Sequence, residues 1–145
     1  MTEKTAQDAI ALARKCHEGQ TDKAGKPYID HVMRVVSRFD DDFSCQVAAL
    51  HDVLEDSDVT PSDLLGEGYS PEVVDAVVLL SRDYAIDDHS YYEAIKRNPA
   101  ALAVKLADLD DNSNPARLCE LEKIDKATAD WLRKKYRLAW EHLSD

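Results

Sequence analysis

The chain has 145 residues, of which 44% are hydrophobic and 32% are charged, a composition typical of a globular protein rather than of a disordered segment. Its formal net charge of −11 argues against binding to nucleic acid, which needs a basic surface. No apolar run approaches the roughly 20 residues of a membrane span. We therefore expect neither nucleic acid nor a membrane as a partner.

Three cysteines, Cys16, Cys45 and Cys119, are widely spaced and odd in number, which argues against a disulfide framework. All three fall among apolar neighbours, so we expect core or near-core thiols. The first residues also lack the apolar core of a signal peptide. These features together predict a protein of the reducing cytoplasm.

Helix signals recur along the chain, and no stretch shows the sustained alternation that is typical of strands. A hydroxyl side chain followed by proline marks two helix starts, at Thr60-Pro61 and Ser70-Pro71. Helices are predicted at about residues 5–17 and 27–39, and a third one carries the stripe over 43–54. Two more begin near residues 60 and 70, and two lie between 87 and 111, divided near Asn98-Pro99. The last predicted helix covers about 125–143. The sequence therefore predicts an all-α bundle.

Two apolar stripes indicate which helix faces are buried. The third predicted helix is expected to be continuous, with an inward face formed by Phe43, Val47, Leu50 and Leu54. The last helix has an inward face of Leu132, Tyr136, Ala139 and Leu143, and the helical spacing of Trp131, Tyr136 and Trp140 predicts core or a dimer face. We expect one domain over residues 1–145, with a motif-bearing core at about 5–115.

Four polar segments on these helices carry the chemistry. They are Tyr28-Ile29-Asp30-His31, His51-Asp52, Glu55-Asp56 and Lys105-Leu106-Ala107-Asp108. Imidazole suits transition metals and carboxylate suits harder ions, so the mixture favours an open hydrolytic metal site over a closed structural zinc site. On a continuous helix, Glu55 and Asp56 follow His51 and Asp52 by one turn, which predicts that all four line one side.

This combination resembles the HD superfamily of metal-dependent phosphohydrolases, and more specifically the hydrolase domain of the RelA/SpoT family and its small stand-alone relatives. The matching text is ARKCHEGQTDKAGKPYIDH over residues 13–31, VAALHDVLEDSDVT over 47–60 and VKLADLDDN over 104–112. These blocks come in the family's order, and the resemblance reaches from about residue 5 to residue 115. It implies a helical bundle of the HD-domain type.

Carried over by position, the resemblance implies a single bound metal ion, Mn²⁺ in the first place, with Fe²⁺, Co²⁺ or Zn²⁺ accepted by the same donors. The implied ligands are His31, His51, Asp52 and Asp108. Glu55 and Asp56 match the acidic pair that orients or deprotonates the attacking water, and either of the two fits the role of base. The implied contacts of a small phosphorylated nucleotide are Lys23 and Asn112. Lys105, three residues before Asp108 and able to share its helix row, is a further expected substrate contact.

The chain also departs from the family pattern. Asp22 stands where the family usually has an arginine-type residue that packs on a guanine ring. Leu109, Asp110 and Asp111 replace the usual Arg-Leu-His, which removes two basic groups beside the pocket. The metal half of the site is thus intact, whereas the substrate half is altered.

Three functions remain open at this point. The first is hydrolysis of guanosine 3′,5′-bis(diphosphate) to release its 3′-pyrophosphate. The second keeps the chemistry but changes the substrate to an adenosine analogue, another nucleotide or the 2′-phosphate of NADPH. The third is a non-catalytic module that senses nucleotides, although such a module has no need of the Glu55-Asp56 pair.

Overall fold

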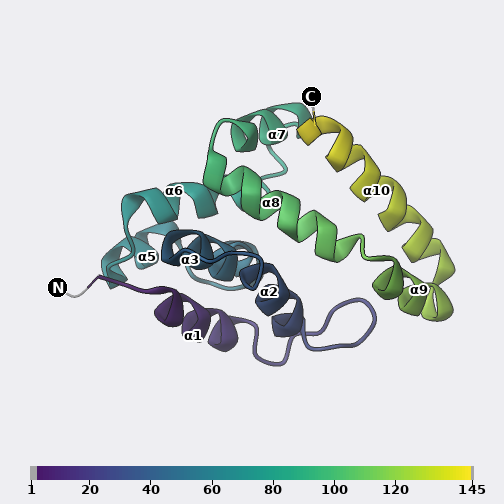
Figure 1. Cartoon of the computed structure of the whole chain (residues 1–145), viewed down its shortest axis with the longest axis horizontal. Coiled ribbons are helices and arrows are strands. Elements are labelled where there is room, and N and C mark those ends of the chain that lie inside the picture. Colours follow the sequence, from purple (N-terminus) through teal and green to yellow (C-terminus); the bar gives the residue numbers. More distant parts are fainter. Residues whose placement is uncertain (1–2, 145) are drawn as a thin grey trace.

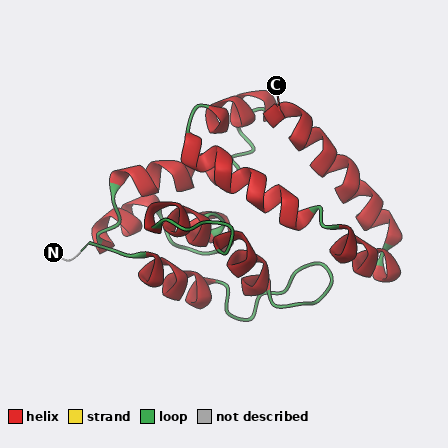
Figure 2. Cartoon of the chain, in the orientation of Figure 1, coloured by secondary structure: helices red, strands yellow, loops and turns green. Residues whose placement is uncertain are grey.

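The structure is a computed structural model that describes residues 3–144, and this part of the chain consists of helices and loops without a strand (Figure 2). The helices are α1 (Ala6–Cys16), α2 (Tyr28–Val36), α3 (Asp42–Leu50), α4 (Val53–Asp56), α5 (Pro61–Glu67), α6 (Pro71–Leu80), α7 (Asp88–Lys96), α8 (Pro99–Asn112), α9 (Pro115–Ile124) and α10 (Lys126–Ser144). The predicted all-α fold is confirmed.

Most helices begin where a side chain caps the first turn. The Thr60 hydroxyl accepts from the Asp63 backbone N–H at 3.1 Å, and the Asp63 carboxylate accepts from the Thr60 N–H at 2.9 Å. This reciprocal pair satisfies two of the backbone donors that a helix start leaves without partners. Ser70 caps α6 through a single bond, in which its hydroxyl accepts from the Val73 N–H at 3.3 Å. Both helices carry proline in the first turn, as the sequence predicts.

The main core is built around α3, which packs against α1, α2, α6 and α8. Four consecutive residues, Val47, Ala48, Ala49 and Leu50, are fully buried, because neighbouring helices cover α3 from every side. Burying a leucine or valine side chain contributes about 1.5–3 kcal/mol. This rigid centre fixes the end of α3, where two of the candidate metal ligands lie.

Helix α10 lies along the opposite edge of the molecule from α1, and α8 runs beside it through the middle (Figure 1). A second, smaller apolar cluster joins α9 to α10 through Leu118, Leu121, Ala129 and Leu132. The loop between α1 and α2 reaches toward α9, and the two are tied by an ion pair of 3.1 Å between Lys26 and Glu120. Two cavities lie on the two sides of α10, as described below.

Several expectations from the sequence are wrong in detail. The third helix is not continuous, since α3 ends at Leu50 and α4 begins at Val53. Phe43 is 38% exposed, because it lies in the first turn of α3 and the buried face starts only at Gln46. Helix α9 has no counterpart in the prediction, although Asn114-Pro115 gives the same start signal as the other helices.

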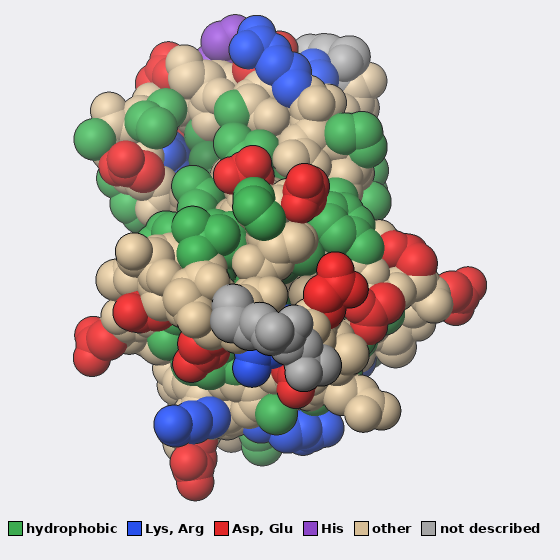
Figure 3. All heavy atoms as spheres, turned by 90° about the vertical axis from the view of Figure 1, so that its left-hand side faces the viewer, with side chains coloured by type: hydrophobic (Ala, Val, Ile, Leu, Met, Phe, Trp, Pro, Cys, Tyr) green, Lys and Arg blue, Asp and Glu red, His purple; other side chains and the backbone are tan. Residues whose placement is uncertain are grey.

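Cys119, expected in or near the core, lies at the surface, and so does Trp131, expected in the core or on a dimer face. Cys119 is an exposed thiol on α9, whereas Cys16 and Cys45 are half-buried, and all three are free. Trp131 is 58% exposed on α10, so it does not belong to the core, and of the two alternatives only a dimer face stays a prediction. The face drawn in Figure 3 carries scattered acidic side chains over its middle, in keeping with the negative charge of the chain. None of the described helices is long and apolar enough to cross a membrane.

Candidate metal centre and its two cavities

The four residues that the sequence proposes as metal ligands converge at one point. His31 comes from α2, His51 and Asp52 from the turn between α3 and α4, and Asp108 from α8. One potential ligand atom of each lies within 4.8 Å of those of the other three. The side chains of His31, His51 and Asp108 are almost completely buried, and Asp52 is nearly so. The core packing of α3 against α2 and α8 therefore assembles the centre.

The turn at His51 and Asp52 exists because the ring of His51 interferes with the helix. Its Nδ1 lies 2.5 Å from the Ala48 carbonyl oxygen, which in a continuous helix would accept the backbone N–H of Asp52. The helix ends, and Asp52 becomes the N-cap of the four-residue helix α4. The break brings the adjacent side chains of His51 and Asp52 to the same point.

The contact with Ala48 also assigns the tautomer of His51. A carbonyl oxygen only accepts, so Nδ1 carries the proton and Nε2 presents its lone pair. That Nε2 is buried and makes no hydrogen bond within the described residues, while carboxylate oxygens of Asp52 and Asp108 lie at 2.9 and 3.3 Å. A lone pair that faces two carboxylates is repelled by them unless a proton or a metal ion lies between the three. The donor set therefore fits a metal ion.

The electrostatics of the site lead to the same conclusion. Burial alone lowers the pKa of a histidine, yet the carboxylates of Asp52 and Asp108 outweigh burial and raise the pKa of His51 well above its ordinary value. The pKa of Asp108 lies well below its usual range, because the ammonium of Lys105 and the two imidazoles outweigh the effect of burial. The site thus strongly favours an additional positive charge, which a divalent ion supplies.

His31 is held from behind by Asp111, a residue to which the sequence assigned no role in the site. The Nδ1 of His31 lies 2.5 Å from Asp111 Oδ2, so Nδ1–H donates to this carboxylate and Nε2 points toward Asp108 at 2.9 Å. A carboxylate behind a histidine ligand fixes the tautomer and raises the basicity of the ring. Burial opposes ionisation of Asp111, but His31 and Arg34 outweigh it and lower its pKa to about 2.

Asp108 and Asp52 are themselves held by neighbours. Asn112, one turn beyond Asp108, donates its amide to Asp108 Oδ1 at 3.1 Å, and Lys105 Nζ lies 3.5 Å from Asp108 Oδ2. The hydroxyl of Tyr28 donates to Asp52 Oδ2. Lys105 and Asn112, both predicted to contact substrate, therefore also surround a candidate ligand. These contacts restrict the carboxylates to orientations that face the centre.

The acidic pair Glu55-Asp56 does not lie on one side with His51 and Asp52, so that expectation is wrong. Because the helix breaks, Glu55 lines the same cavity as the candidate ligands, and its Oε1 accepts from the backbone N–H of Arg82. Asp56 lies against the end of α1 instead, with Oδ2 at 3.9 Å from His17 Nδ1. Burial raises the pKa of both carboxyl groups above their ordinary values.

Two cavities border the centre. The first, here called the metal cavity, has a volume of about 550 Å³ and is lined by His51, Asp52, Glu55, Asp108, Lys134 and Lys135, among others. The second, the loop cavity, has about 430 Å³ and is lined by Lys23, Tyr28, Asn112, Arg117, Leu132 and Tyr136, among others. Tyr28 and Asn112 link them, since both line the loop cavity and donate to a candidate ligand that lines the metal cavity.

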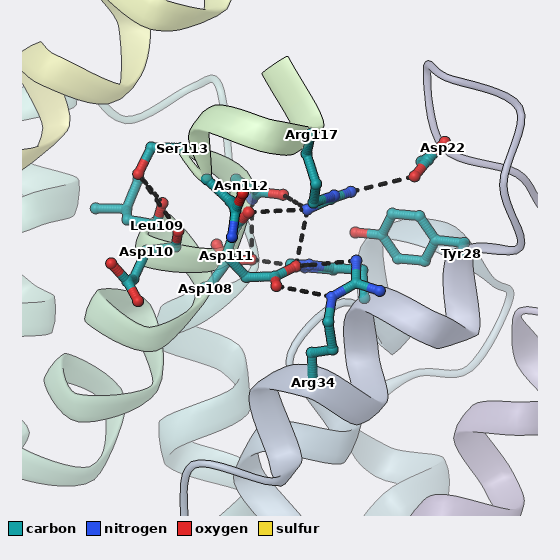
Figure 4. A network of polar contacts seen from close by, with 12 residues as sticks. Asp22, Tyr28, Arg34, Asp108, Leu109, Asp110, Asp111, Asn112, Ser113 and Arg117 are labelled. Carbon is teal, nitrogen blue, oxygen red and sulfur yellow. Dashed lines mark hydrogen bonds and ion pairs between the residues drawn. The ribbon is translucent and has the colours of Figure 1, made fainter. Parts of the chain in front are cut away.

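Arg117 of α9 is a further residue that the sequence did not reveal as part of the site. Its guanidinium donates to Asp111 Oδ2 at 2.8 Å and to Asp22 Oδ2 at 3.2 Å, and Arg34 binds Asp111 from the other side (Figure 4). Asp22 also accepts from the backbone N–H groups of Ala24 and Lys26, both at 2.9 Å, which closes the loop on itself. The two departures from the family pattern, at positions 22 and 111, are thus joined by one arginine.

The comparisons with known proteins agree with this geometry. No protein-family model matches the chain. It is 41% identical over 83 residues to the guanosine-3′,5′-bis(diphosphate) 3′-pyrophosphohydrolase of Vibrio cholerae, which covers 52% of this chain and 12% of that protein. It is 31% identical over an alignment of 152 residues to the protein of the same name from Haemophilus influenzae, which covers 92% of this chain and 22% of that protein. The chain thus spans less than a quarter of the length of these relatives.

The fold is also found among solved structures. A metazoan orthologue of SpoT, described as hydrolysing ppGpp and playing a role in starvation responses, matches with a TM-score of 0.64. The match covers 94% of this chain and 93% of that one, at 21% sequence identity. The resemblance inferred from the motifs is therefore confirmed in sequence and in fold.

Proposed function

Because the chain is RelA/SpoT hydrolase-like in sequence and fold, we propose that it is a metal-dependent phosphohydrolase that releases pyrophosphate from guanosine 3′,5′-bis(diphosphate). The observation that carries the proposal is the convergence of His31, His51, Asp52 and Asp108 within 4.8 Å. Beside them, a carboxylate in reach of solvent and a group of lysines complete what hydrolysis of an anionic substrate needs.

The metal that we propose is Mn²⁺, held by the two imidazoles and the two carboxylates, with Fe²⁺, Co²⁺ or Zn²⁺ as alternatives for the same donors. Once bound there, such an ion lowers the pKa of a water molecule and polarises a phosphoryl oxygen. Asp111 and Asn112 support this site by holding His31 and Asp108 in place.

Glu55 is the base in our proposal, since it lines the metal cavity together with three of the four candidate ligands. Its carboxylate takes a proton from the attacking water, whose oxygen forms a bond to the phosphorus next to the ribose 3′ oxygen. The bond between that phosphorus and the ribose oxygen breaks, and the ribose oxygen takes up a proton, which Glu55 can return. Asp56, held against His17, acts as a positioning residue for the α4 segment.

The nucleoside end of the substrate is assigned to the loop cavity, where Lys23 and Asn112 lie. Asp22 favours a second candidate function, because its carboxylate is bound to Arg117 and to two backbone N–H groups and therefore braces the loop instead of contacting a base. The base-recognition surface thus differs from a pattern built for guanine. The second candidate is the same chemistry on another nucleotide, such as an adenosine analogue or NADPH.

We also propose that the protein acts in the cytoplasm. Its three cysteines are free thiols, and at least one of them is exposed, a state that a reducing compartment maintains.

The test is release of phosphate or pyrophosphate by the Mn²⁺-loaded protein from guanosine tetraphosphate, its adenosine counterpart, NADPH and simple nucleotides. Asp52→Ala serves as the control without a complete metal site. Pyrophosphate from the guanosine compound, absent in the variant, is the expected result. Turnover of another compound instead would change the assigned substrate and leave the proposed metal-dependent hydrolysis unchanged. No turnover with Mn²⁺ bound would contradict the proposal of an enzyme and favour a nucleotide-sensing module.

A further inference from the structure

Helix α10 forms a wall of both cavities. Leu132 and Tyr136, one turn apart, line the loop cavity, whereas Trp131 and Lys135, also one turn apart, line the metal cavity. Figure 1 shows α10 running beside α8, which carries Asp108. One helix therefore faces both the nucleoside side and the metal side of the proposed active site.

The metal cavity contains more cations than its own carboxylates bind. Arg82 pairs with Asp88 at 2.5 Å, and Lys105 lies 3.5 Å from Asp108. Lys134 and Lys135 also line this cavity, and within residues 3–144 neither forms an ion pair with a carboxylate. Two ammonium groups thus stand beside the metal centre without a carboxylate in ion-pair contact.

The surroundings of Lys135 indicate the charge of a group that would bind beside it. Its ammonium lies over the ring of Trp131 at 5.3 Å. Burial, together with the nearby cations Lys105 and Lys23, lowers the pKa of Lys135, because these effects outweigh the opposite effect of Glu55 and Asp108. Like charges held together in a partly buried cavity repel one another, and an anion among them relieves this repulsion.

We infer that Lys134 and Lys135, together with Lys105, form the subsite for the diphosphate group that is transferred to water. This inference rests on the proposed function and adds the orientation of the substrate between the two cavities. The phosphates point into the metal cavity toward α10, and the nucleoside occupies the loop cavity. A diphosphate carries several negative charges, and lysine is a common phosphate ligand that binds through charge rather than through a fixed geometry.

The chemistry of the centre agrees with this direction. Glu55 and three of the four candidate ligands line the metal cavity, so the phosphorus that reacts lies at its inner end. The rest of the diphosphate must then extend either toward the α10 lysines or toward the loop cavity. Of the cations that line the loop cavity, Lys26, Arg34 and Arg117 are each paired with a carboxylate, which leaves Lys23 among the described residues. On the metal side, Lys134 and Lys135 are both without an ion pair in the described part of the chain. The lysine side is therefore the electrostatically favoured one.

The experiment is calorimetric binding of inorganic pyrophosphate to the Mn²⁺-loaded chain, compared with inorganic phosphate. The test variant is Lys134→Met/Lys135→Met, which removes two charges and retains the apolar stems. The matched control is Lys123→Met/Lys126→Met, which removes two charges at exposed positions of α9 and α10. Mn²⁺ affinity and the thermal unfolding midpoint are measured for each protein.

We expect the test variant to bind pyrophosphate at least tenfold more weakly, with Mn²⁺ affinity and the unfolding midpoint as in the control. Product inhibition by pyrophosphate should weaken equally, while inhibition by the nucleoside diphosphate stays unchanged. Equal pyrophosphate binding by both variants would overturn the inference, even if the enzyme hydrolyses guanosine tetraphosphate. Conversely, lysine-dependent pyrophosphate binding without hydrolysis of any nucleotide would support the subsite and contradict the proposed function.

Discussion

Arg117 on α9 and Asp22 in the α1–α2 loop lie 95 positions apart in the sequence, and their side chains form an ion pair of 3.2 Å. The same guanidinium binds Asp111, which in turn accepts from the ring of His31. A continuous series of charged contacts therefore connects the loop that borders the nucleoside cavity to a candidate ligand of the metal centre.

Arg117→Met should impair substrate binding more than metal binding. Asp22 loses its contact with α9 and keeps only the two backbone N–H groups of its own loop, whereas Asp111 keeps Arg34. The loop is therefore held less firmly while His31 stays in place. We expect KM to rise about tenfold and Mn²⁺ affinity to change less. A double-mutant cycle with Asp22→Asn measures the coupling, which we expect at about 0.5–1 kcal/mol for a partly exposed pair. Strictly additive effects of the two substitutions would show that the pair does not act together.

Asp111→Asn should weaken the metal site without removing a ligand. The amide keeps the size of the side chain but loses the charge that holds Nδ1–H of His31, and such losses typically cost about 10- to 100-fold in metal affinity. Titration calorimetry with Mn²⁺ measures the effect. The neighbouring Asp110→Asn, at a half-exposed residue that pairs with Arg38, is the matched control. Equal affinities of the two variants would rule out the supporting role of Asp111.

Glu55→Gln should retain Mn²⁺ and lower kcat by about 10²- to 10⁴-fold, as expected for the loss of a general base. Asp56→Asn should have a smaller effect, because Asp56 lies against His17 on the side of α1. Single-turnover rates and Mn²⁺ titrations of both variants, with Asp52→Ala as the metal-free reference, separate the two roles. A larger loss of kcat in Asp56→Asn than in Glu55→Gln would mean that Asp56 is the base and Glu55 the positioning residue.

Asp22 should make the stability of the loop dependent on pH. Burial opposes its ionisation, but the backbone N–H of Lys26 and the guanidinium of Arg117 outweigh burial and lower the pKa of Asp22 below its ordinary value. A depressed pKa means that the contribution is complete above the pKa of the unfolded chain, about 4, and is lost as pH falls through the lower folded value.

Limited proteolysis of the loop between pH 6 and pH 3 tests this dependence. Cleavage of the wild-type loop should rise below about pH 4, while Asp22→Asn should be cleaved readily at every pH. An acid-resistant protease is needed throughout the range. Identical profiles of the two proteins would mean that another group controls the loop.

The four candidate ligands could be proposed from the sequence because their residue types and their order carry the chemistry, and the structure brings these four residues together. It fails at the break after Leu50, since that break results from a contact between the His51 ring and the Ala48 carbonyl rather than from a helix-stop residue. The roles of Asp111 and Arg117 depend on contacts between segments far apart in the chain, which local spacing does not encode. Helix α9, by contrast, was predictable from Asn114-Pro115.

The position of Trp131 has a practical consequence. The chain contains two tryptophans, and Trp131 lies half exposed at the edge of the metal cavity beneath the ammonium of Lys135, whereas Trp140 packs against the main core. An anion that draws Lys135 away from the indole changes the polarity around one emitting side chain and leaves the other undisturbed. The protein thus carries a native fluorophore at the mouth of its site, so that occupancy can be followed optically in the unlabelled molecule.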